Sequence, residues 1–347
     1  MPEWLPQRGR HAASQGSGFG GGDAMDVVCL GILVADVFAS PVDALPAAGE
    51  LKLTERFLST VGGCAANTAI DLRRLGRSVA VVGKVGVDMF GDFVVSEFER
   101  HGIEASGIRR SRSLPTSGTV ILNVRGEDRR YLHSFGANAE FGLADVDLGI
   151  LDEARILYVG GYLAMPGFPA ADLRRLFRAA RQRSVTTVLD VVIPAGASVS
   201  LDSIRDVLPF TDYFLPNQDE ARRLTGLASA EEQATRLAAI DGECTVVITR
   251  GREGSVTRHG TALIDTAPFL VESVDESGAG DAFTAGFITG LLEGWPLDSI
   301  LCFAGAVGAS CTRALGCHEG VFRFSEALDA MAERAGARVS GASSPVQ

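Results

Sequence analysis

The chain has 347 residues, of which 46% are hydrophobic and 22% are charged, a balance that is typical of a globular protein and argues against a disordered or fibrous one. Its 43 acidic residues outnumber its 32 basic residues and give a formal net charge of −11, so we expect no nucleic-acid partner and no attachment to an anionic membrane. No apolar run reaches the roughly 20 residues of a membrane span. The six cysteines contain no C-x-x-C pair and favour buried thiols in a reducing, cytoplasmic compartment.

The two ends of the chain differ in composition from the body between them. Residues 1–24 end in a glycine-rich run and lack the apolar core of a secretory signal, so we expect a flexible N-terminal extension. Arg8 and Arg10 leave a targeting peptide as the alternative. Residues 338–347 are small and polar and predict a flexible C-terminal tail. Residues 25–337 then form one domain.

Between these ends, apolar runs that are typical of buried strands alternate with segments of helical periodicity. The strand candidates are residues 26–33, 79–85, 156–159, 186–192, 213–215 and 244–249. The helix candidates are residues 65–75, 93–100, 170–182, 218–225, 231–239, 280–293 and 298–313. This alternation predicts an α/β fold with a mostly parallel central sheet that helices cover on both faces.

Two segments depart from this alternation. Residues 38–60 and 113–135 place polar and apolar residues in turn, as in Thr119–Val124, which is typical of strands with one solvated face. We expect them to form antiparallel strands of a small β-sheet lid on the α/β domain, with His133 as a packed residue. An exposed sheet invites pairing with a second copy, so we expect a homodimer through the lid.

The segment Val274–Phe283 places a small, glycine-rich turn before an apolar helix. Such a turn presents successive backbone N–H groups at a helix N-terminus, where negative charge is favoured. Asp281 lies in the first turn of this helix. It can serve only the helix dipole, or it can act as a general base beside an anion site, and its position alone leaves both interpretations open.

The run from Asp275 to Gly286 resembles D-x-x-G-A-G-D-A-F-x-x-G, the C-terminal signature of the ribokinase-like family of carbohydrate (sugar and nucleoside) kinases. Further elements of that family follow its order along this chain: Gly62–Ala69, Leu75-Gly76, Gly83–Gly91, Pro216–Glu220 and Thr249–Gly251 with Gly254. The resemblance covers roughly residues 26–335. It implies a ribokinase-like (Rossmann-like) fold and an ATP-dependent phosphotransferase that uses Mg²⁺.

The resemblance assigns the reacting groups to the glycine-rich turn. Asp281 would take the proton of the attacking hydroxyl, and backbone N–H groups would hold the transferring phosphoryl group at Gly278, Ala279 and Gly280. The residues implied at ATP are Asn217, Thr249, Gly251, Gly254, Gly278 and Gly280. Asn217 and Glu220 would also position Mg²⁺ through water, with a reciprocal helix cap as the alternative. Members of the family often bind K⁺ through backbone carbonyls, here at Asp275 and Ser277 with residues 311–320.

The resemblance also assigns the acceptor side. Asp36 would accept hydrogen bonds from substrate hydroxyls, and Gly62 and Gly63 would bring the backbone next to the sugar. Asn67 would supply an amide to the substrate, or else cap a helix. Tyr131 and Asn138 would contact the substrate from the lid and the segment after it, with a structural role as the alternative.

Four positions depart from the family's pattern. Cys64 follows the glycine pair where several members have Lys, and Glu276-Ser277 precedes the turn where Thr is common. Gly305 stands where an Asn near the adenine is frequent. The residue that contacts the base therefore stays open.

We expect an ATP-dependent kinase that phosphorylates a hydroxyl, by preference a primary one, of a free sugar or sugar acid. A nucleoside kinase of the same family is the alternative, but residues 109–138 offer only Tyr131 and Phe135 as aromatics for a base. A non-catalytic sugar-binding paralogue is less favoured because Asp281 and Gly278–Gly280 are intact. The fold hosts many substrates, so the sugar itself does not follow from the sequence.

Overall fold

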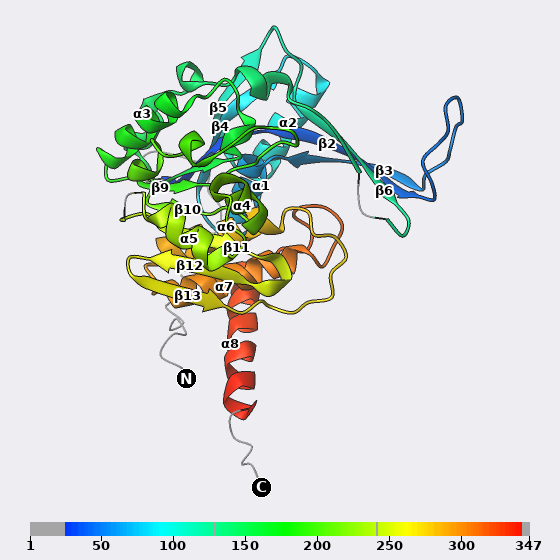
Figure 1. Cartoon of the computed structure of the whole chain (residues 1–347). Helices are drawn as coiled ribbons and strands as arrows, with labels where there is room; N and C mark the ends of the chain where they lie inside the picture. Colours follow the sequence, from blue (N-terminus) through cyan, green and yellow to red (C-terminus); the bar gives the residue numbers. More distant parts are fainter. Residues whose placement is uncertain (1–24, 128–129, 241, 342–347) are drawn as a thin grey trace.

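The computed structural model describes residues 25–127, 130–240 and 242–341. The predicted extension at residues 1–24 lies outside these ranges, as do residues 342–347 of the predicted tail. Helix α8 (Phe324–Gly341) continues over residues 338–341, beyond the predicted end of the domain, and extends away from the rest of the fold (Figure 1).

A nine-stranded sheet forms the centre of the fold, in the order β13-β12-β11-β10-β9-β8-β1-β4-β5. The strands from β11 to β5 run parallel, and β12 and β13 add an antiparallel hairpin at one edge. The bounds are β1 (Met25–Gly31), β4 (Val79–Gly86), β5 (Glu104–Ser111), β8 (Ala154–Gly160), β9 (Thr186–Leu189), β10 (Tyr213–Phe214), β11 (Thr245–Thr249), β12 (Ser255–His259) and β13 (Ala262–Thr266). The predicted α/β fold with a mostly parallel sheet is confirmed, whereas the sequence pattern does not predict β5, β12 and β13.

Helices cover both faces of this sheet because alternate residues of its strands belong to two separate cores. In β1, Val27 and Cys29 pack into one core, while Val28 and Leu30 pack into the other. The first core holds α1 (Cys64–Arg74), α2 (Met89–Arg100), α6 (Ala279–Leu292), α7 (Leu297–Cys311) and α8. The second holds α3 (Ala170–Arg181), α4 (Gln218–Thr225) and α5 (Ala230–Ala238).

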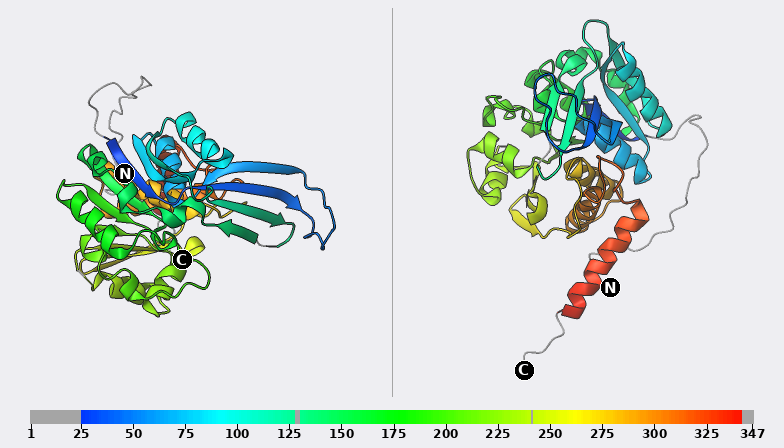
Figure 2. Two further views of the ribbon diagram at one scale, coloured as in Figure 1. Left: turned by 90° about the horizontal axis from the view of Figure 1, so that it is seen from above. Right: turned by 90° about the vertical axis from the view of Figure 1, so that its right-hand side faces the viewer.

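A separate four-stranded sheet, in the order β3-β2-β6-β7, forms the predicted lid and projects from the body (Figures 1 and 2). Its strands are β2 (Val34–Val42), β3 (Arg56–Gly62), β6 (Gly118–Val124) and β7 (Arg130–Ser134). The strands were expected to be antiparallel throughout, but β2 and β6 pair in parallel. The chain enters β2 directly from β1 and returns to the body through β3 and α1. The lid therefore continues from the carboxyl end of β1.

Several polar side chains follow the carboxyl ends of the parallel strands. Asp190 comes after β9, Asn217 follows β10, and Thr249 ends β11. In parallel α/β sheets this edge is where ligands bind. None of the helices in the part of the chain that the structure describes is long and apolar enough to cross a bilayer.

Candidate active site

The turn Ser277–Gly280, which we call the anion turn, leads directly into α6. Gly278 has a φ of 75°, and a Cβ there would lie 2.7 Å from the Cβ of Cys317, so both the backbone conformation and the space require glycine. Among the described residues, the N–H groups of Gly278 and Gly280 meet no backbone acceptor, while that of Ala279 reaches the Glu276 carbonyl at 3.4 Å. The turn therefore presents backbone donors at a helix N-terminus.

Asp281 lies in the first turn of α6, beside these donors. The amide of Asn67 donates a 2.7 Å hydrogen bond to Oδ2 of Asp281, and the Thr68 hydroxyl donates to its backbone carbonyl at 3.4 Å. Burial raises the pKa of Asp281 to about 6, although the hydrogen bond from Asn67 lowers it. The carboxylate is thus ionised at neutral pH and close to the point where it can take up a proton.

Cys64 and Asp190 complete a cluster with Asp281 in which one ligand atom of each residue lies within 4.8 Å of the others. Asp190 accepts hydrogen bonds from the backbone N–H of Val191 at 2.8 Å and from the Tyr158 hydroxyl at 3.3 Å. Burial, followed by the neighbouring carboxylates Glu220 and Asp281, raises the pKa of Asp190. Asp190 was not among the predicted site residues; an acid directly after a buried parallel strand is the signal that could have identified it.

Asn217 and Glu220 form a reciprocal cap at the start of α4. The Asn217 Oδ1 accepts from the Glu220 backbone N–H at 2.9 Å, and Glu220 Oε2 accepts from the Asn217 backbone N–H at 2.9 Å. Burial raises the pKa of Glu220 to about 7. The reciprocal helix cap, which was the alternative interpretation of these two residues, is therefore present. Their role at Mg²⁺ stays a prediction.

Three of the residues that the resemblance assigns to ATP, Thr249, Gly251 and Gly254, lie at the turn between β11 and β12. Asn217 forms an isolated parallel bridge with Thr249, which places the α4 cap beside this turn. Gly254 has a φ of 85°, and a Cβ there would lie 2.0 Å from the Thr266 carbonyl oxygen. Gly251 has a φ of 53°. Gly254 therefore requires glycine and Gly251 favours it, and their contact with ATP stays a prediction.

Glu276, the charged residue before the anion turn, is paired. The Arg252 guanidinium donates to its Oε1 at 3.1 Å from both Nε and Nη2. This pair connects the β11–β12 turn to the anion turn. The Arg252 guanidinium therefore balances the charge of Glu276 in this structure.

Asp36 lies on β2 and faces the glycine pair of the acceptor side. A Cβ at Gly62 would lie 1.9 Å from its Oδ2, and Gly63, which has a φ of 93°, is the N-cap of helix α1. Burial raises the pKa of Asp36 to about 6, while a hydrogen bond from Thr119 lowers it. The Thr119 hydroxyl also lies 3.1 Å from Nδ1 of His133.

Asp36, Thr119 and His133 are register partners across β2, β6 and β7, so they share one face of the lid. Tyr131 lies two residues from His133 and shares that face, with 52% of its surface exposed. His133 is exposed, so the expectation that it is a packed residue is wrong. The sequence analysis missed this row because the pairing of β6 and β7 is not visible in the pattern.

Asn138 is buried and bonds with both ends of its amide to the backbone of Leu33. Its Oδ1 accepts from the Leu33 N–H at 3.2 Å, and its Nδ2 donates to the Leu33 carbonyl at 2.9 Å. This contact holds the corner between β1 and β2. Asn138 therefore has the structural role that was the alternative to a role in substrate binding. A contact between Asn138 and the substrate stays a prediction.

Asp275 and Ser277, assigned to K⁺ by the resemblance, are engaged within the protein. The Asp275 carboxylate accepts from the backbone N–H groups of Ser277 at 2.9 Å and Gly316 at 3.0 Å. The Ser277 carbonyl oxygen lies 3.2 Å from Sγ of Cys311. These contacts connect the anion turn to the loop that follows α7.

A pair of Asp71 and His318 lies beneath the acceptor side and was also missed. His318 Nδ1 is 3.0 Å from Oδ1 of Asp71, which is fully buried on α1. Burial lowers the pKa of His318, but the Asp71 carboxylate raises it, and the net direction is upward. The pair connects α1 to the loop after α7, as Asn67 connects α1 to α6.

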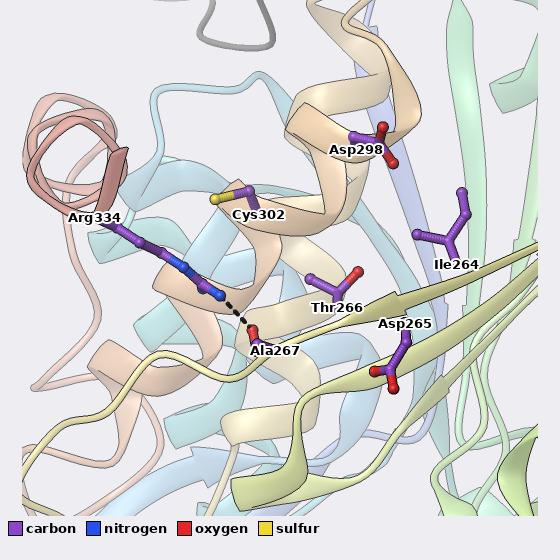
Figure 3. A pocket seen from close by; sticks show the side chains of 7 residues that line it. All are labelled: Ile264, Asp265, Thr266, Ala267, Asp298, Cys302 and Arg334. Atoms are coloured by element: carbon purple, nitrogen blue, oxygen red, sulfur yellow. Dashed lines mark hydrogen bonds between the residues drawn. The ribbon is translucent and has the colours of Figure 1, made fainter. Parts of the chain in front are cut away.

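A cavity of about 220 Å³ lies apart from these residues, between β13, α7 and α8 (Figure 3). Its lining is Ile264, Asp265, Thr266, Ala267, Asp298, Cys302 and Arg334. Arg334 donates to the Ala267 carbonyl at 2.9 Å and lies 4.4 Å from the centre of the Phe269 ring. A Cβ at Gly305 would lie 3.4 Å from that ring, so Phe269 occupies the space beside the glycine.

Comparison with known proteins places this geometry in context. The model of the pfkB carbohydrate kinases matches residues 24–321. A 5-dehydro-2-deoxygluconokinase of Clostridium perfringens is 29% identical over 307 residues, which cover 85% of this chain and 89% of the relative. A ribokinase of Haemophilus influenzae is also 29% identical, over 306 residues, which cover 86% of this chain and 96% of the relative.

Solved structures agree in fold. A ribokinase of Arabidopsis thaliana, in complex with ribose and ATP, superposes with a TM-score of 0.75 at 24% identity, over 89% of this chain and 99% of that chain. A ribokinase from Thermotoga maritima gives a TM-score of 0.75 at 22% identity, over 89% and 99% of the two chains. The expected ribokinase-like fold with a small lid sheet is confirmed.

Proposed function

Because the chain belongs to the pfkB family of carbohydrate kinases, we propose that it transfers the γ-phosphoryl group of ATP to a hydroxyl of a free sugar or sugar acid. The observation that carries this proposal is the half-buried Asp281 carboxylate, held by Asn67 beside the backbone donors of the anion turn. The named relatives are sugar kinases, so the nucleoside alternative is not favoured. A primary hydroxyl is the least hindered acceptor.

In the proposed reaction, Asp281 takes the proton of the acceptor hydroxyl while its oxygen forms a bond to the γ-phosphorus and the bond to ADP breaks. The N–H groups of Gly278 and Gly280, assisted by that of Ala279, stabilise the charge on the transferring phosphoryl oxygens. Thr249, Gly251 and Gly254 form the nucleotide side.

Mg²⁺ neutralises phosphate charge when it is bound with ATP. Carboxylate oxygens are the ligands that this ion prefers, and Asp190 and Glu220 bring two of them to the site with pKa values raised by burial. Asn217 holds Glu220 in place through the reciprocal cap. We therefore assign Asp190, Asn217 and Glu220 to the metal side.

Potassium is left out of the proposed reaction. An ion on the Ser277 carbonyl would have to displace the Cys311 thiol, whose sulfur lies 3.2 Å from that oxygen. This carbonyl therefore does not fit the ion as it stands. We expect equal rates in potassium and tetramethylammonium salts, and strong activation by potassium would contradict this.

On the acceptor side, Asp36 accepts hydrogen bonds from substrate hydroxyls, and Gly62, Gly63 and Asn67 surround them. The Thr119 and His133 side chains continue the row from Asp36 across the lid, and Tyr131 lies on the same face. We propose that the lid closes over the acceptor and excludes water, since water would otherwise receive the phosphoryl group. The free thiols of all six cysteines are compatible with a cytoplasmic enzyme.

The opposite face of the lid supports a homodimer. Phe57, Val120 and Leu132 lie on the face away from Asp36 and expose 73%, 41% and 67% of their surfaces. Apolar residues gathered on an unpaired sheet face are typical of an interface. We propose that two copies pair through these faces.

The test is turnover of Asp281→Asn and of the wild type against a panel of pentoses, hexoses, sugar acids and nucleosides. The amide keeps the size of the side chain but cannot take the proton, so kcat should fall by about 10²–10⁴ with ATP binding and melting temperature near those of the wild type. A kcat within about threefold of the wild type, well short of that range, would remove Asp281 from the mechanism.

A further inference from the structure

The proposed acid–base chemistry leaves one buried group beside the anion turn unused. Cys311 ends helix α7 and is fully buried. Its Sγ lies 3.2 Å from the Ser277 carbonyl oxygen and 3.1 Å from the Cys317 carbonyl oxygen. One thiol therefore contacts both the anion turn and the loop that packs against it.

The contact with Ser277 has a consequence for the next residue because of peptide geometry. The Ser277–Gly278 peptide is trans, so its C=O and N–H groups point in opposite directions. The carbonyl of this peptide points to Cys311. The N–H of Gly278 consequently points away from Cys311, and it meets no backbone acceptor among the described residues.

The thiol is suited to hold this orientation. Burial, with additional contributions from nearby carboxylates, raises the pKa of Cys311, so the group stays protonated and can donate. Without a donor, the two carbonyl oxygens would face the same buried space with no hydrogen between them, which is unfavourable. Gly278 has a left-handed conformation, with a φ of 75°. Glycine has few intrinsic backbone restraints, so contacts with neighbouring groups must hold this conformation.

We propose that Cys311 is a positioning residue of the reaction, which fixes the Ser277–Gly278 peptide so that the Gly278 N–H is aimed at the transferring phosphoryl group. This inference rests on the proposed role of the anion turn. Cys311 does not touch the reacting atoms itself. Its loss should therefore lower kcat, while the KM for the sugar, whose proposed binding residues lie on the lid and on α1, should stay unchanged.

The test compares Cys311→Ser with Cys311→Ala, which differ by one hydroxyl. Serine keeps a donor and alanine does not, so the inference predicts a kcat near that of the wild type for Cys311→Ser. For Cys311→Ala it predicts a fall of about tenfold or more, below the roughly 10²–10³ that removal of a whole oxyanion donor costs. Cys311→Val, which lacks a donor but leaves no cavity, should behave like Cys311→Ala and replaces it if that variant does not fold.

A packing role predicts the opposite order. If no donor is required, burial of the serine hydroxyl is unfavourable, and the kcat of Cys311→Ser would not exceed that of Cys311→Ala. Cys311→Val would then be the most active of the three. Equal kcat values for the serine and alanine variants, or a slower serine variant, would overturn the inference. Cys29→Ala is the matched control: among the described residues, this buried thiol on β1 makes no hydrogen bond to the anion turn, so its loss should change the melting temperature but not kcat.

Failure of this inference can be distinguished from failure of the proposed function. If Asp281→Asn is inactive and Cys311→Ala is as active as the wild type, only the role of Cys311 is lost. If Asp281→Asn keeps its activity, the mechanism itself is wrong, whatever the Cys311 variants show.

Discussion

The side-chain amide of Asn67 donates a 2.7 Å hydrogen bond to Oδ2 of Asp281 and so joins helix α1 to helix α6 across 214 residues of sequence. Helix α1 begins directly after Gly62 and Gly63, and the backbone of Gly62 lies close to the Asp36 carboxylate. The same helix therefore orients the proposed base and carries the end of the lid.

Because burial raises the pKa of Asp281 to about 6, kcat should depend on pH. The base works only when ionised, so the rate should fall as the pH drops through about 6 and should be fully present above it. The hydrogen bond from Asn67 lowers this pKa. In Asn67→Ala the midpoint should move upward by about one to two pH units, since a hydrogen bond to a charged group contributes roughly 1.5–3 kcal/mol.

The measurement is kcat against pH at saturating sugar, ATP and Mg²⁺. Asn138→Ala is the matched control, because this buried amide bonds to Leu33 and not to Asp281. It should lose stability and keep the midpoint of the wild type. An unchanged midpoint in Asn67→Ala would show that the amide does not act on the base.

Sequence reasoning reached some of these residues and not others for physical reasons. The anion turn and Asp281 are contiguous in the chain, so a local motif contains them. Asn67 was identified for the acceptor, but its bond to Asp281 depends on the packing of two distant helices. Asp190 stands alone after β9, and only the arrangement of parallel strands brings it to the other carboxylates.

The elements of the fold, too, were predicted only in part. Buried parallel strands are apolar runs and could be predicted, whereas β5 at the sheet edge is polar, with Arg109 and Arg110 among its residues. Helix α2 begins at Met89 rather than at the predicted residue 93, because Asp88 accepts from the Gly91 N–H at 2.8 Å and caps it. Such a cap adds a turn that the apolar periodicity does not contain.

Glu220→Gln should separate the metal role of this residue from its role in the helix cap. The glutamine oxygen can still accept from the Asn217 N–H, so α4 should keep its stability within about 1 kcal/mol. The loss of charge should raise the Mg²⁺ concentration for half-maximal rate several-fold and leave the KM for the sugar unchanged. Asp219→Asn removes a neighbouring acid that pairs with Arg222 and should change neither value. Identical Mg²⁺ dependence of both variants would leave Glu220 as a cap only.

Thr119→Val should weaken acceptor binding. The hydroxyl of Thr119 connects Asp36 to His133, and valine keeps the shape while it removes both contacts. We expect the KM for the sugar to rise by about tenfold, the equivalent of one hydrogen bond of roughly 1.4 kcal/mol, with little change in kcat. Val120→Thr changes the adjacent residue on the opposite face of the lid and should leave this KM unaltered. If the two variants have the same KM, the row from Asp36 to His133 does not reach the sugar.

Leu132→Glu should convert the proposed dimer to a monomer. Leu132 exposes 67% of its surface on the lid face that we assign to the interface. A two-fold axis would repeat the substitution, so two carboxylates would be brought into an apolar contact with no cation to pair with them. Sedimentation equilibrium should give a dimer for the wild type and a monomer for this variant. Leu263→Glu places the same charge on β13, outside the lid, where the wild-type leucine is 46% exposed, and should remain dimeric. A wild type that sediments as a monomer, or a Leu132→Glu variant that stays a dimer, would contradict pairing through the lid.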